Sequence, residues 1–260
     1  MNYDIYYVDA FTDKLFSGNP AAVIFSDITD TNLMQSIAAE NNLSETAFIN
    51  KTNGSFNIRW FSPSCEIDLC GHATLASAYV FFNHISPDEK VFEVQSLKNG
   101  ILKVTLKDEL LFLDFPKDDY KIFDQISLIE KIIGIKPIEA YKGRDDILTI
   151  LESENSIKEL KVDFNSLEDI NARGLIVSSK SKEYDFVSRF FAPSTGVNED
   201  PVTGSAHTTL TPYWSKKLNK KKLVAAQLSD RGGILYCEDQ GERIIIGGKA
   251  VQYLKGEINI

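Results

Sequence analysis

The segment Arg59-Trp60-Phe61-Ser62-Pro63-Ser64 decides the fold, because it returns in altered form as Arg189-Phe190-Phe191-Ala192-Pro193-Ser194. Each copy leads through an aspartate and a glycine into a helix-like stretch, over residues 68–76 and 200–207. The two copies start at positions 59 and 189, a spacing equal to half of the 260-residue chain. One unit is therefore used twice. We expect the two units to be related by a pseudo-two-fold axis, with equivalent loops facing each other across a cleft.

The repeat predicts two halves, since a chain of this length can form either one large domain or two smaller ones. The charged, proline-containing stretch 116–120 is the best boundary, so the first half covers 1–115 and the second 116–250. The last residues, 251–260, are expected to return to the first half. Each half has a candidate central helix, at 72–82 and at 208–218. The first is apolar on all sides, as a buried helix is.

Composition and charge exclude several classes of function. The net charge is −9 and the isoelectric point is near 5.0, which argues against a nucleic-acid partner. The chain has only three cysteines, a number that suits a reducing compartment without a disulfide framework. No window approaches the roughly 18 apolar residues of a membrane span, and the N-terminus does not resemble a signal peptide. A cytoplasmic protein without membrane contact is the prediction.

Two glycine turns carry the first chemical signal. Gly71 and Gly204 each stand just before a predicted helix. A helix N-terminus offers unpaired N–H groups and partial positive charge, and glycine lets an anion approach the backbone closely. Two such turns facing each other would hold a small anion, most simply a carboxylate. A plain turn role for both glycines is the alternative.

The ionisable residues of the two copies are Asp68, His72, Asp200 and His207. His72 directly follows Gly71, and at a helix N-terminus its pKa is expected to fall, which would leave it neutral and able to exchange a proton. His207 is expected to pack inside its helix.

Three familiar site types are not predicted. Cys65, Cys70 and His72 lack a recognised zinc spacing, so no metal site is expected. The chain has no Gly-x-Ser-x-Gly hydrolase motif and no glycine-rich dinucleotide-binding motif.

Four segments together resemble the PhzF-like, phenazine biosynthesis-type isomerases of the diaminopimelate epimerase-like superfamily. They are spread over the whole chain: Val8–Thr12 with Gly18–Val23, Asn42–Phe48, Asp68–Ala76 and Glu199–His207. The resemblance implies an α+β fold of two pseudo-symmetric halves, each a curved sheet wrapped around a central helix, with the site in the cleft between them. It also implies an isomerase that needs no cofactor.

The resemblance also implies roles for individual residues. Glu45 matches the family's general acid/base, and it serves a proton shift of the 1,3 type on a small carboxylate-bearing substrate. His72 and Asp200 assist proton movement and hold the substrate. The substrate contacts come from the two glycine turns, through Gly71, Ser205, Cys70 and Gly204. A homodimer is left open as the assembly.

Two alternatives stay open at this stage. Amino-acid epimerases of this superfamily use two cysteines, one from each half. Cys70 occupies the first position, but Thr203 stands at the second, and its hydroxyl is far less acidic than a thiol. An epimerase based on Cys70 is therefore the second hypothesis. A binding protein without catalysis on the same scaffold is the third.

Overall fold

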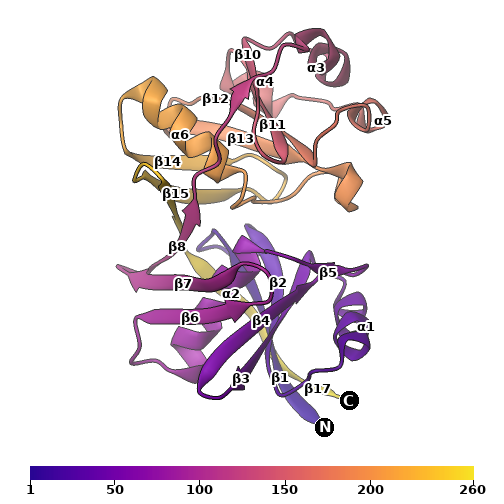
Figure 1. Ribbon diagram of the computed structural model, residues 1–260, viewed down its shortest axis with the longest axis vertical. Coiled ribbons are helices and arrows are strands. Elements are labelled where there is room, and N and C mark those ends of the chain that lie inside the picture. Colours follow the sequence, from indigo (N-terminus) through magenta and orange to yellow (C-terminus); the bar gives the residue numbers. More distant parts are fainter. The chain divides into compact units, whose positions relative to one another are not determined.

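The computed structural model describes residues 1–260 and divides them into two compact units (Figure 1). Unit 1 consists of Met1–Asp114 with Gly247–Ile260, and unit 2 of Phe115–Ile246. No helix combines the length and the apolarity that crossing a membrane would require.

Unit 1 contains a curved sheet with helices on both of its faces. Its elements, in chain order, are β1 (Asn2–Ala10), β2 (Asn19–Phe25), α1 (Thr31–Asn41), β3 (Glu45–Thr52), β4 (Ser55–Phe61), β5 (Glu66–Ile67), α2 (Gly71–Val80), the π-helix η1 (Phe81–Ile85), β6 (Val91–Ser96), β7 (Gly100–Lys107), β8 (Leu110–Pro116, whose end passes into unit 2) and β17 (Ala250–Asn259).

From β1–β2 to β6–β7, the strand pairs of unit 1 alternate between antiparallel and parallel. β1 pairs antiparallel with β17 on one side and with β2 on the other. Along the sheet, β2–β3 is parallel, β3–β4 antiparallel, β4–β6 parallel and β6–β7 antiparallel. Each parallel pair needs a crossover connection, and these connections carry α1 and α2.

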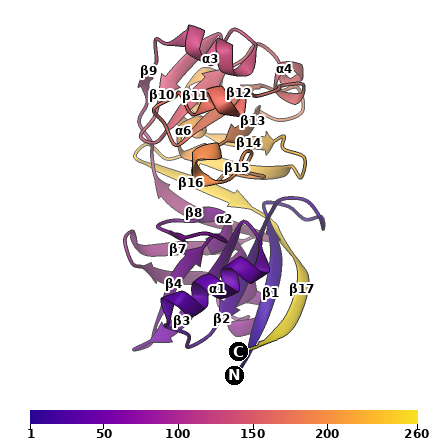
Figure 2. The ribbon, with the colours of Figure 1, turned by 90° about the vertical axis from the view of Figure 1, so that its right-hand side faces the viewer.

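The central helix of unit 1 is α2, which packs against β1, β2 and β3 (Figure 1). Eight of its ten residues are buried, as its uniformly apolar sequence predicts. The hydroxyls of Thr74 and Ser77 donate to the carbonyls of Cys70 and Ala73, so burial leaves neither unsatisfied. The predicted helix 72–82 begins one residue earlier and changes to a π-helix at Phe81. On the sheet's other face, α1 packs against β3 and β4 (Figure 2).

Unit 2 repeats this plan with more short helices. Its elements are β9 (Lys121–Ile122), α3 (Ile126–Ile133), β10 (Glu139–Lys142), β11 (Asp146–Ile150), α4 (Glu154–Lys158), α5 (Phe164–Leu167), β12 (Gly174–Lys180), β13 (Phe186–Phe191), the 3₁₀ turn η2 (Pro193–Thr195), α6 (His207–Leu218), β14 (Lys222–Gln227), β15 (Gly233–Asp239) and β16 (Arg243–Gly248, whose end passes into unit 1).

The pairing of the strands in unit 2 follows the same alternation. β10–β11 is antiparallel, β11–β12 parallel, β12–β13 antiparallel, β13–β14 parallel and β14–β15 antiparallel. The helix α6 lies between β13 and β14 in the chain, as α2 lies between β4 and β6. It begins at His207, one residue before the predicted start. Two halves, each with a sheet around a central helix, are thus confirmed as the architecture.

The repeated sequence string makes the same contacts in both units. The guanidinium of Arg59 donates twice to Glu66, at 2.7 Å, and lies 5.0 Å from the Phe61 ring centre. Arg189 donates twice to Glu199, at 2.7 and 2.8 Å, and lies 4.9 Å from the Phe191 ring. A strand arginine that stacks on the ring two residues later therefore tethers the chain that leads to each central helix.

Candidate active site

Unit 1 brings three of the predicted site residues together. Glu45 begins β3, Cys70 is the N-cap of α2, and His72 is the second residue of that helix. The His72 Nε2 atom lies 3.0 Å from Glu45 Oε2, and the Cys70 Sγ atom lies 3.5 Å from His72 Nδ1. Gly71 is the first helical residue, where its backbone sits at the positive end of the helix dipole. Residues far apart in the sequence thus form one cluster.

Glu45 has a buried oxygen that is not used by a hydrogen bond. Its side chain is 18% exposed, and Oε2 accepts no aligned hydrogen bond. The contact with His72 is an ion pair at 3.0 Å rather than a well-aligned hydrogen bond. A buried carboxylate oxygen with a free lone pair is costly in a purely structural role, and it suits a group that takes up a proton.

The charge of His72 differs from the prediction. Burial by itself would lower the pKa of this imidazole, but the nearby Cys70 sulfur and Glu45 carboxylate raise it well above its usual value. The expected fall of the pKa at a helix N-terminus is therefore wrong. A carboxylate oxygen at 3.0 Å interacts more strongly with the ring than the partial charge of the helix end does. We assign His72 as an imidazolium that faces Glu45.

The thiol of Cys70 is the third member of the cluster. Burial raises its pKa, and the negative charge of Glu45 raises it further. The sulfur is therefore a neutral thiol near pH 7 and a poor base. Since a neutral thiol carries no charge, the raised pKa of His72 near pH 7 depends on the Glu45 carboxylate at 3.0 Å. The ligand atoms of Glu45, Cys70 and His72 all lie within 4.8 Å of one another, so these residues are the ones that could hold a metal ion. The absence of a metal stays a prediction.

Unit 2 places Asp200, Gly204 and Ser205 on one turn before α6. The Thr203 hydroxyl donates to Asp200 Oδ2 at 2.6 Å, and Gln227 Nε2 donates to the Asp200 carbonyl at 2.7 Å. The Thr203 N–H donates in turn to Gln227 Oε1 at 2.9 Å. These bonds fix the turn. They also engage the hydroxyl of Thr203, which stands at the position of the second cysteine in the amino-acid epimerases.

The start of the second helix differs from the prediction. Gly204 lies in a turn, where its carbonyl accepts from the His207 N–H at 3.0 Å. The helix α6 begins only at His207. Gly204 is therefore not at the helix N-terminus itself. The reason is local: a tight turn over Gly204 and Ser205 precedes the helix, whereas Gly71 enters α2 directly from an extended Cys70.

His207 is a packing residue, as the sequence suggests. Its ring is fully buried, its Nδ1 lies 2.8 Å from the Thr203 carbonyl, and it packs beside Phe186. Burial lowers the pKa of His207 to about 4, because only a backbone carbonyl favours its charged form. The third histidine, His84, lies at the end of η1 and contacts Gln252.

Sequence reasoning missed the residues that support the second turn. Arg173 donates to Ser205 Oγ at 3.1 Å and twice to the buried carboxylate of Asp146. Gln227, which is 1% exposed, ends the apolar strand β14. A buried glutamine after an apolar run is a usable sequence signal, but nothing in the sequence connects Asp146 with Arg173.

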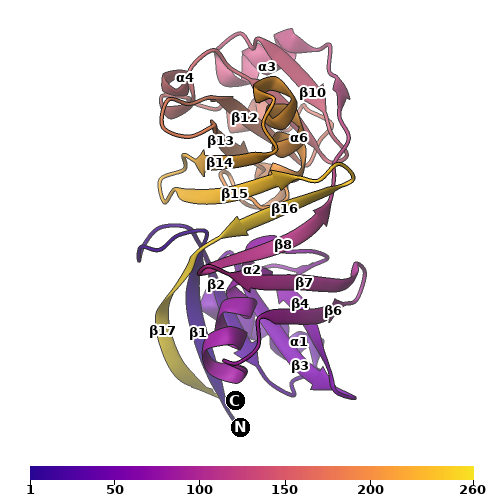
Figure 3. The same ribbon diagram turned by 90° about the vertical axis from the view of Figure 1, so that its left-hand side faces the viewer.

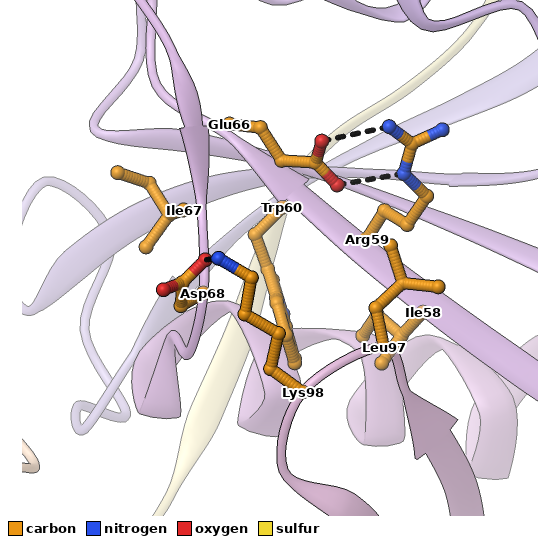
Figure 4. A pocket seen from close by; sticks show the side chains of 8 residues that line it. All are labelled: Ile58, Arg59, Trp60, Glu66, Ile67, Asp68, Leu97 and Lys98. Carbon is orange, nitrogen blue, oxygen red and sulfur yellow. Dashed lines mark hydrogen bonds and ion pairs between the residues drawn. The ribbon is translucent and has the colours of Figure 1, made fainter.

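A small pocket of about 170 Å³ opens where β4 changes its neighbour from β6 to β5 (Figure 4). Its charges are paired: Arg59 binds Glu66, and Lys98 lies 2.6 Å from Asp68. None of the predicted catalytic or substrate-binding residues lines this pocket.

Comparison with solved structures defines the class of protein. The fold matches a hydroxyproline epimerase from Agrobacterium vitis with a TM-score of 0.63 over 99% of this chain and 92% of that one. At 8% identity this likeness shows the shared fold alone. A phenazine biosynthesis protein of the PhzF family from Enterococcus faecalis matches with a TM-score of 0.97 and 46% identity over all of both chains. The predicted diaminopimelate epimerase-like fold is confirmed.

The family follows from the sequence comparison. The family model described as phenazine biosynthesis-like protein matches residues 8–256, and the chain belongs to that family. It is 45% identical over 263 residues, covering all of both chains, to a Pseudomonas aeruginosa protein named an uncharacterized isomerase. The chain is therefore an enzyme of the isomerase class, as predicted.

Proposed function

We propose that this isomerase works without a cofactor and moves a proton within a small carboxylate-bearing substrate, with Glu45 as general acid and base. The observation that carries the proposal is the buried Oε2 of Glu45, which accepts no hydrogen bond and faces an imidazolium. The carboxylate takes a proton from one carbon, and the electron pair shifts along an adjacent double bond. Glu45 then returns the proton to the far carbon, so the composition of the molecule is unchanged.

His72 and the start of α2 have supporting roles in this proposal. The imidazolium offsets the buried negative charge of Glu45 and orients the carboxylate. The N–H groups at Gly71 and His72 suit a substrate carboxylate and the charge that develops toward it. The substrate-binding roles expected for Asp200, Gly204 and Ser205 of unit 2 stay predictions.

An epimerase that uses Cys70 is the second candidate, favoured by the 3.5 Å contact between its sulfur and His72 Nδ1. Two observations weigh against it. The pKa of the thiol is raised rather than lowered, and Thr203 stands where the second thiol would be. A single neutral thiol cannot supply the two bases of a two-thiol epimerisation.

Hydrogen exchange tests the proposal. A panel of small unsaturated carboxylic acids is incubated with the enzyme in deuterated water and followed by NMR for isomerisation and deuterium uptake. We expect Glu45→Gln to slow both by about 10³-fold or more, because the amide cannot carry the proton. Glu93→Gln is the matched control, since Glu93 is an exposed glutamate of the same unit that pairs with Lys103 at 3.6 Å.

Three outcomes discriminate between the hypotheses. Near-normal rates in Glu45→Gln with a large loss in Cys70→Ser would favour the epimerase. Tight binding of an acid without any exchange would favour a binding protein. Loss in Glu45→Gln alone supports the proposal.

A further inference from the structure

Unit 2 contains a counterpart of the contact between Glu45 and His72. Its central helix α6 packs against the sheet that contains β12 and β14 (Figure 3). In the turn before that helix, Ser205 follows Gly204 as His72 follows Gly71. The strand registers identify what contacts Ser205, because β3 and β12 occupy the same place in the two sheets. Each has a parallel neighbour on one side and an antiparallel neighbour on the other.

The register of β3 and β12 relates the two units residue by residue. Glu45 lies one residue before the position that pairs with Phe61. Gly174 lies one residue before the position that pairs with Phe191. The two phenylalanines are the same position of the repeated string. Gly174 therefore corresponds to Glu45, and Arg173 immediately precedes it.

Gly174 leaves no room for an acidic side chain in unit 2. A Cβ at this position would lie 2.5 Å from the Phe190 ring and 2.8 Å from the Phe191 carbonyl oxygen, so a glutamate is excluded. The preceding residue supplies the contact with the turn instead, since Arg173 Nη2 donates to Ser205 Oγ at 3.1 Å. Unit 2 thus has an arginine–serine contact where unit 1 has a glutamate–histidine contact.

The guanidinium of Arg173 is held in one orientation by the start of β11. Nε and Nη2 donate to the two oxygens of Asp146, whose side chain is 5% exposed. The guanidinium carbon also lies 5.5 Å from the centre of the Phe190 ring. A planar fork that binds a buried carboxylate with two parallel hydrogen bonds has little freedom to rotate. The second hydrogen of Nη2 is therefore fixed on Ser205 Oγ.

This contact sets the direction of the Ser205 hydroxyl. A serine hydroxyl has one hydrogen to donate and two lone pairs that accept. Arginine only donates, so Ser205 Oγ is the acceptor in its bond with Arg173. Within the chain this is the one hydrogen bond of Oγ, and its own hydrogen remains for a bound molecule.

The positive charge of Arg173 is offset by its surroundings. Burial by itself would lower the pKa of Arg173, but the carboxylates of Asp146, Asp145 and Asp200 raise it. Three carboxylates near one guanidinium leave little net positive charge to attract an anion. This balance favours a role through the Ser205 hydroxyl over direct binding of an anion by Arg173.

We propose that Arg173, anchored by Asp146, is a positioning residue that directs the Ser205 hydroxyl toward the carboxylate of the substrate. The assignment rests on the proposed function, in which the substrate carries a carboxylate. It gives the two units separate tasks, since Glu45 moves the proton and the oriented Ser205 holds the acid. A hydroxyl that is oriented in advance loses little freedom on binding, so its hydrogen bond contributes more to affinity.

A double-mutant cycle on binding tests the assignment in the full chain. All proteins carry Glu45→Gln, so that the acid binds without turnover. NMR titration then gives the dissociation constant of the acid that binds most tightly in the exchange panel. Ser205→Ala should raise this constant by about tenfold or more, because a hydrogen bond to a charged group is lost. Arg173→Lys should raise it by about fivefold, since lysine keeps the charge but not the fixed fork. The double change should exceed Ser205→Ala by less than about twofold.

Asp146→Asn gives a second test that leaves Arg173 in place. The amide accepts only one of the two bonds, so the fork loosens, and the dissociation constant should rise by about threefold where Ser205 is present. An arginine that bound the acid directly would behave in the opposite way, because loss of the Asp146 charge would tighten binding. Equal or tighter binding in Asp146→Asn would therefore overturn the proposal.

Arg59→Lys is the matched control. It breaks the same kind of bidentate, ring-stacked contact, with Glu66 and Phe61, and should leave the dissociation constant within about twofold. Urea unfolding verifies that each variant is folded. An unchanged constant in Arg173→Lys would reduce that residue to a structural role and refute the proposal. The same factor for Arg173→Lys with and without Ser205 would also refute it, since Arg173 would then contact the acid itself.

The binding cycle and the exchange experiment test different residues. Full exchange in Glu45→Gln would refute the proton transfer assigned to Glu45, while the coupling between Arg173 and Ser205 could still be measured. A cycle without coupling would remove Arg173 from the site and leave the role of Glu45 unaffected.

Discussion

The two units build the same scaffold around Arg59 and Arg189 but different chemistry at the turn before the central helix. In unit 1, Cys70 and His72 flank the glycine and face a carboxylate. In unit 2, Thr203 is bonded to Asp200 at 2.6 Å, and Ser205 accepts from an arginine. The duplicated unit has thus kept the residues that fold it. It has diverged at the residues that could meet a substrate.

The two buried histidines differ in the direction in which their pKa values are shifted. Each lies within the first two residues of its central helix. The pKa of His72 is raised, because its ring lies 3.0 Å from the Glu45 carboxylate, while the pKa of His207 falls to about 4 in a site with a single carbonyl partner. Position at a helix terminus therefore does not fix the charge of a histidine. The nearest charged side chain does.

Among the changes that test this comparison of the two units, His72→Asn is expected to have the largest effect. The change removes the imidazolium that faces Glu45 and should lower turnover by about 10²-fold or more, since assisting acid–base groups typically contribute 10²–10⁴-fold. Steady-state kinetics on a substrate found by the exchange panel measures it. His84→Asn is the control, because the polar and ring contacts of His84 are with Gln252 and Tyr6 rather than with Glu45. Equal activity of the two variants would remove His72 from the mechanism.

The second prediction uses pH to separate the two histidines. The pKa of His207 is about 4 when folded and near 6.5 when unfolded, so the unfolded chain binds the proton more readily. Its contribution to the free energy of unfolding is complete above pH 6.5. That contribution falls by up to about 3 kcal/mol as the pH drops toward 4. His72 acts in the opposite direction: its contribution is complete below pH 6.5 and is lost as the pH rises through its raised pKa.

Urea unfolding from pH 4 to 7 checks this prediction. The wild type should lose more stability on acidification than His207→Asn does, and the difference should develop between pH 6.5 and 4. Parallel curves for the two proteins would contradict the assignment of His207 as a buried neutral histidine.

The contrast between the units also shows what the sequence could reveal. The Arg-x-Phe string predicted two equivalent halves because it occurs twice, and its contacts are nearly local: each arginine stacks on a ring two residues away. The apolar run after Gly71 predicted a buried helix for the same reason. Contacts between distant segments were not accessible in this way, such as Arg173 with Asp146, because no periodicity or spacing connects them.

The charge of His72 shows a second limit. The helix end was visible in the sequence and implied a lowered pKa. The opposing carboxylate belongs to β3, and without its distance the two effects could not be weighed. Glu45 itself was singled out only through the family resemblance, since a glutamate between Ser44 and Thr46 carries no signal alone. The predicted helix start at Gly204 was wrong for a local reason, because a tight turn precedes α6.

The third prediction concerns the shared scaffold. Arg189→Lys should cost about 2 kcal/mol of stability and Arg59→Lys about 1 kcal/mol, because lysine cannot make the bidentate and stacked contacts. The larger cost arises because Arg189 also donates to two carbonyls, those of Ile157 and Leu160, both at 3.1 Å. The further contacts of Arg59 are with the Thr31 hydroxyl at 3.0 Å and with the weakly accepting sulfur of Met34 at 3.6 Å. Urea unfolding of both variants measures the difference. A larger loss of stability in Arg59→Lys than in Arg189→Lys would contradict this ranking of the two arginines.

The smallest effect is expected for Cys70→Ser, and it decides how far the units have diverged. The thiol is buried and neutral, and its partner position in unit 2 is already a hydroxyl residue, Thr203. Serine keeps a small polar group beside His72, so turnover should change by less than about tenfold, while deuterium uptake by the substrate persists. A loss of about 10³-fold, with Glu45→Gln still active, would mean that Cys70 carries the proton. Thr203→Cys would then be the informative second change, because it would restore a thiol to both turns and should raise epimerisation if the two-thiol reaction is accessible to this scaffold.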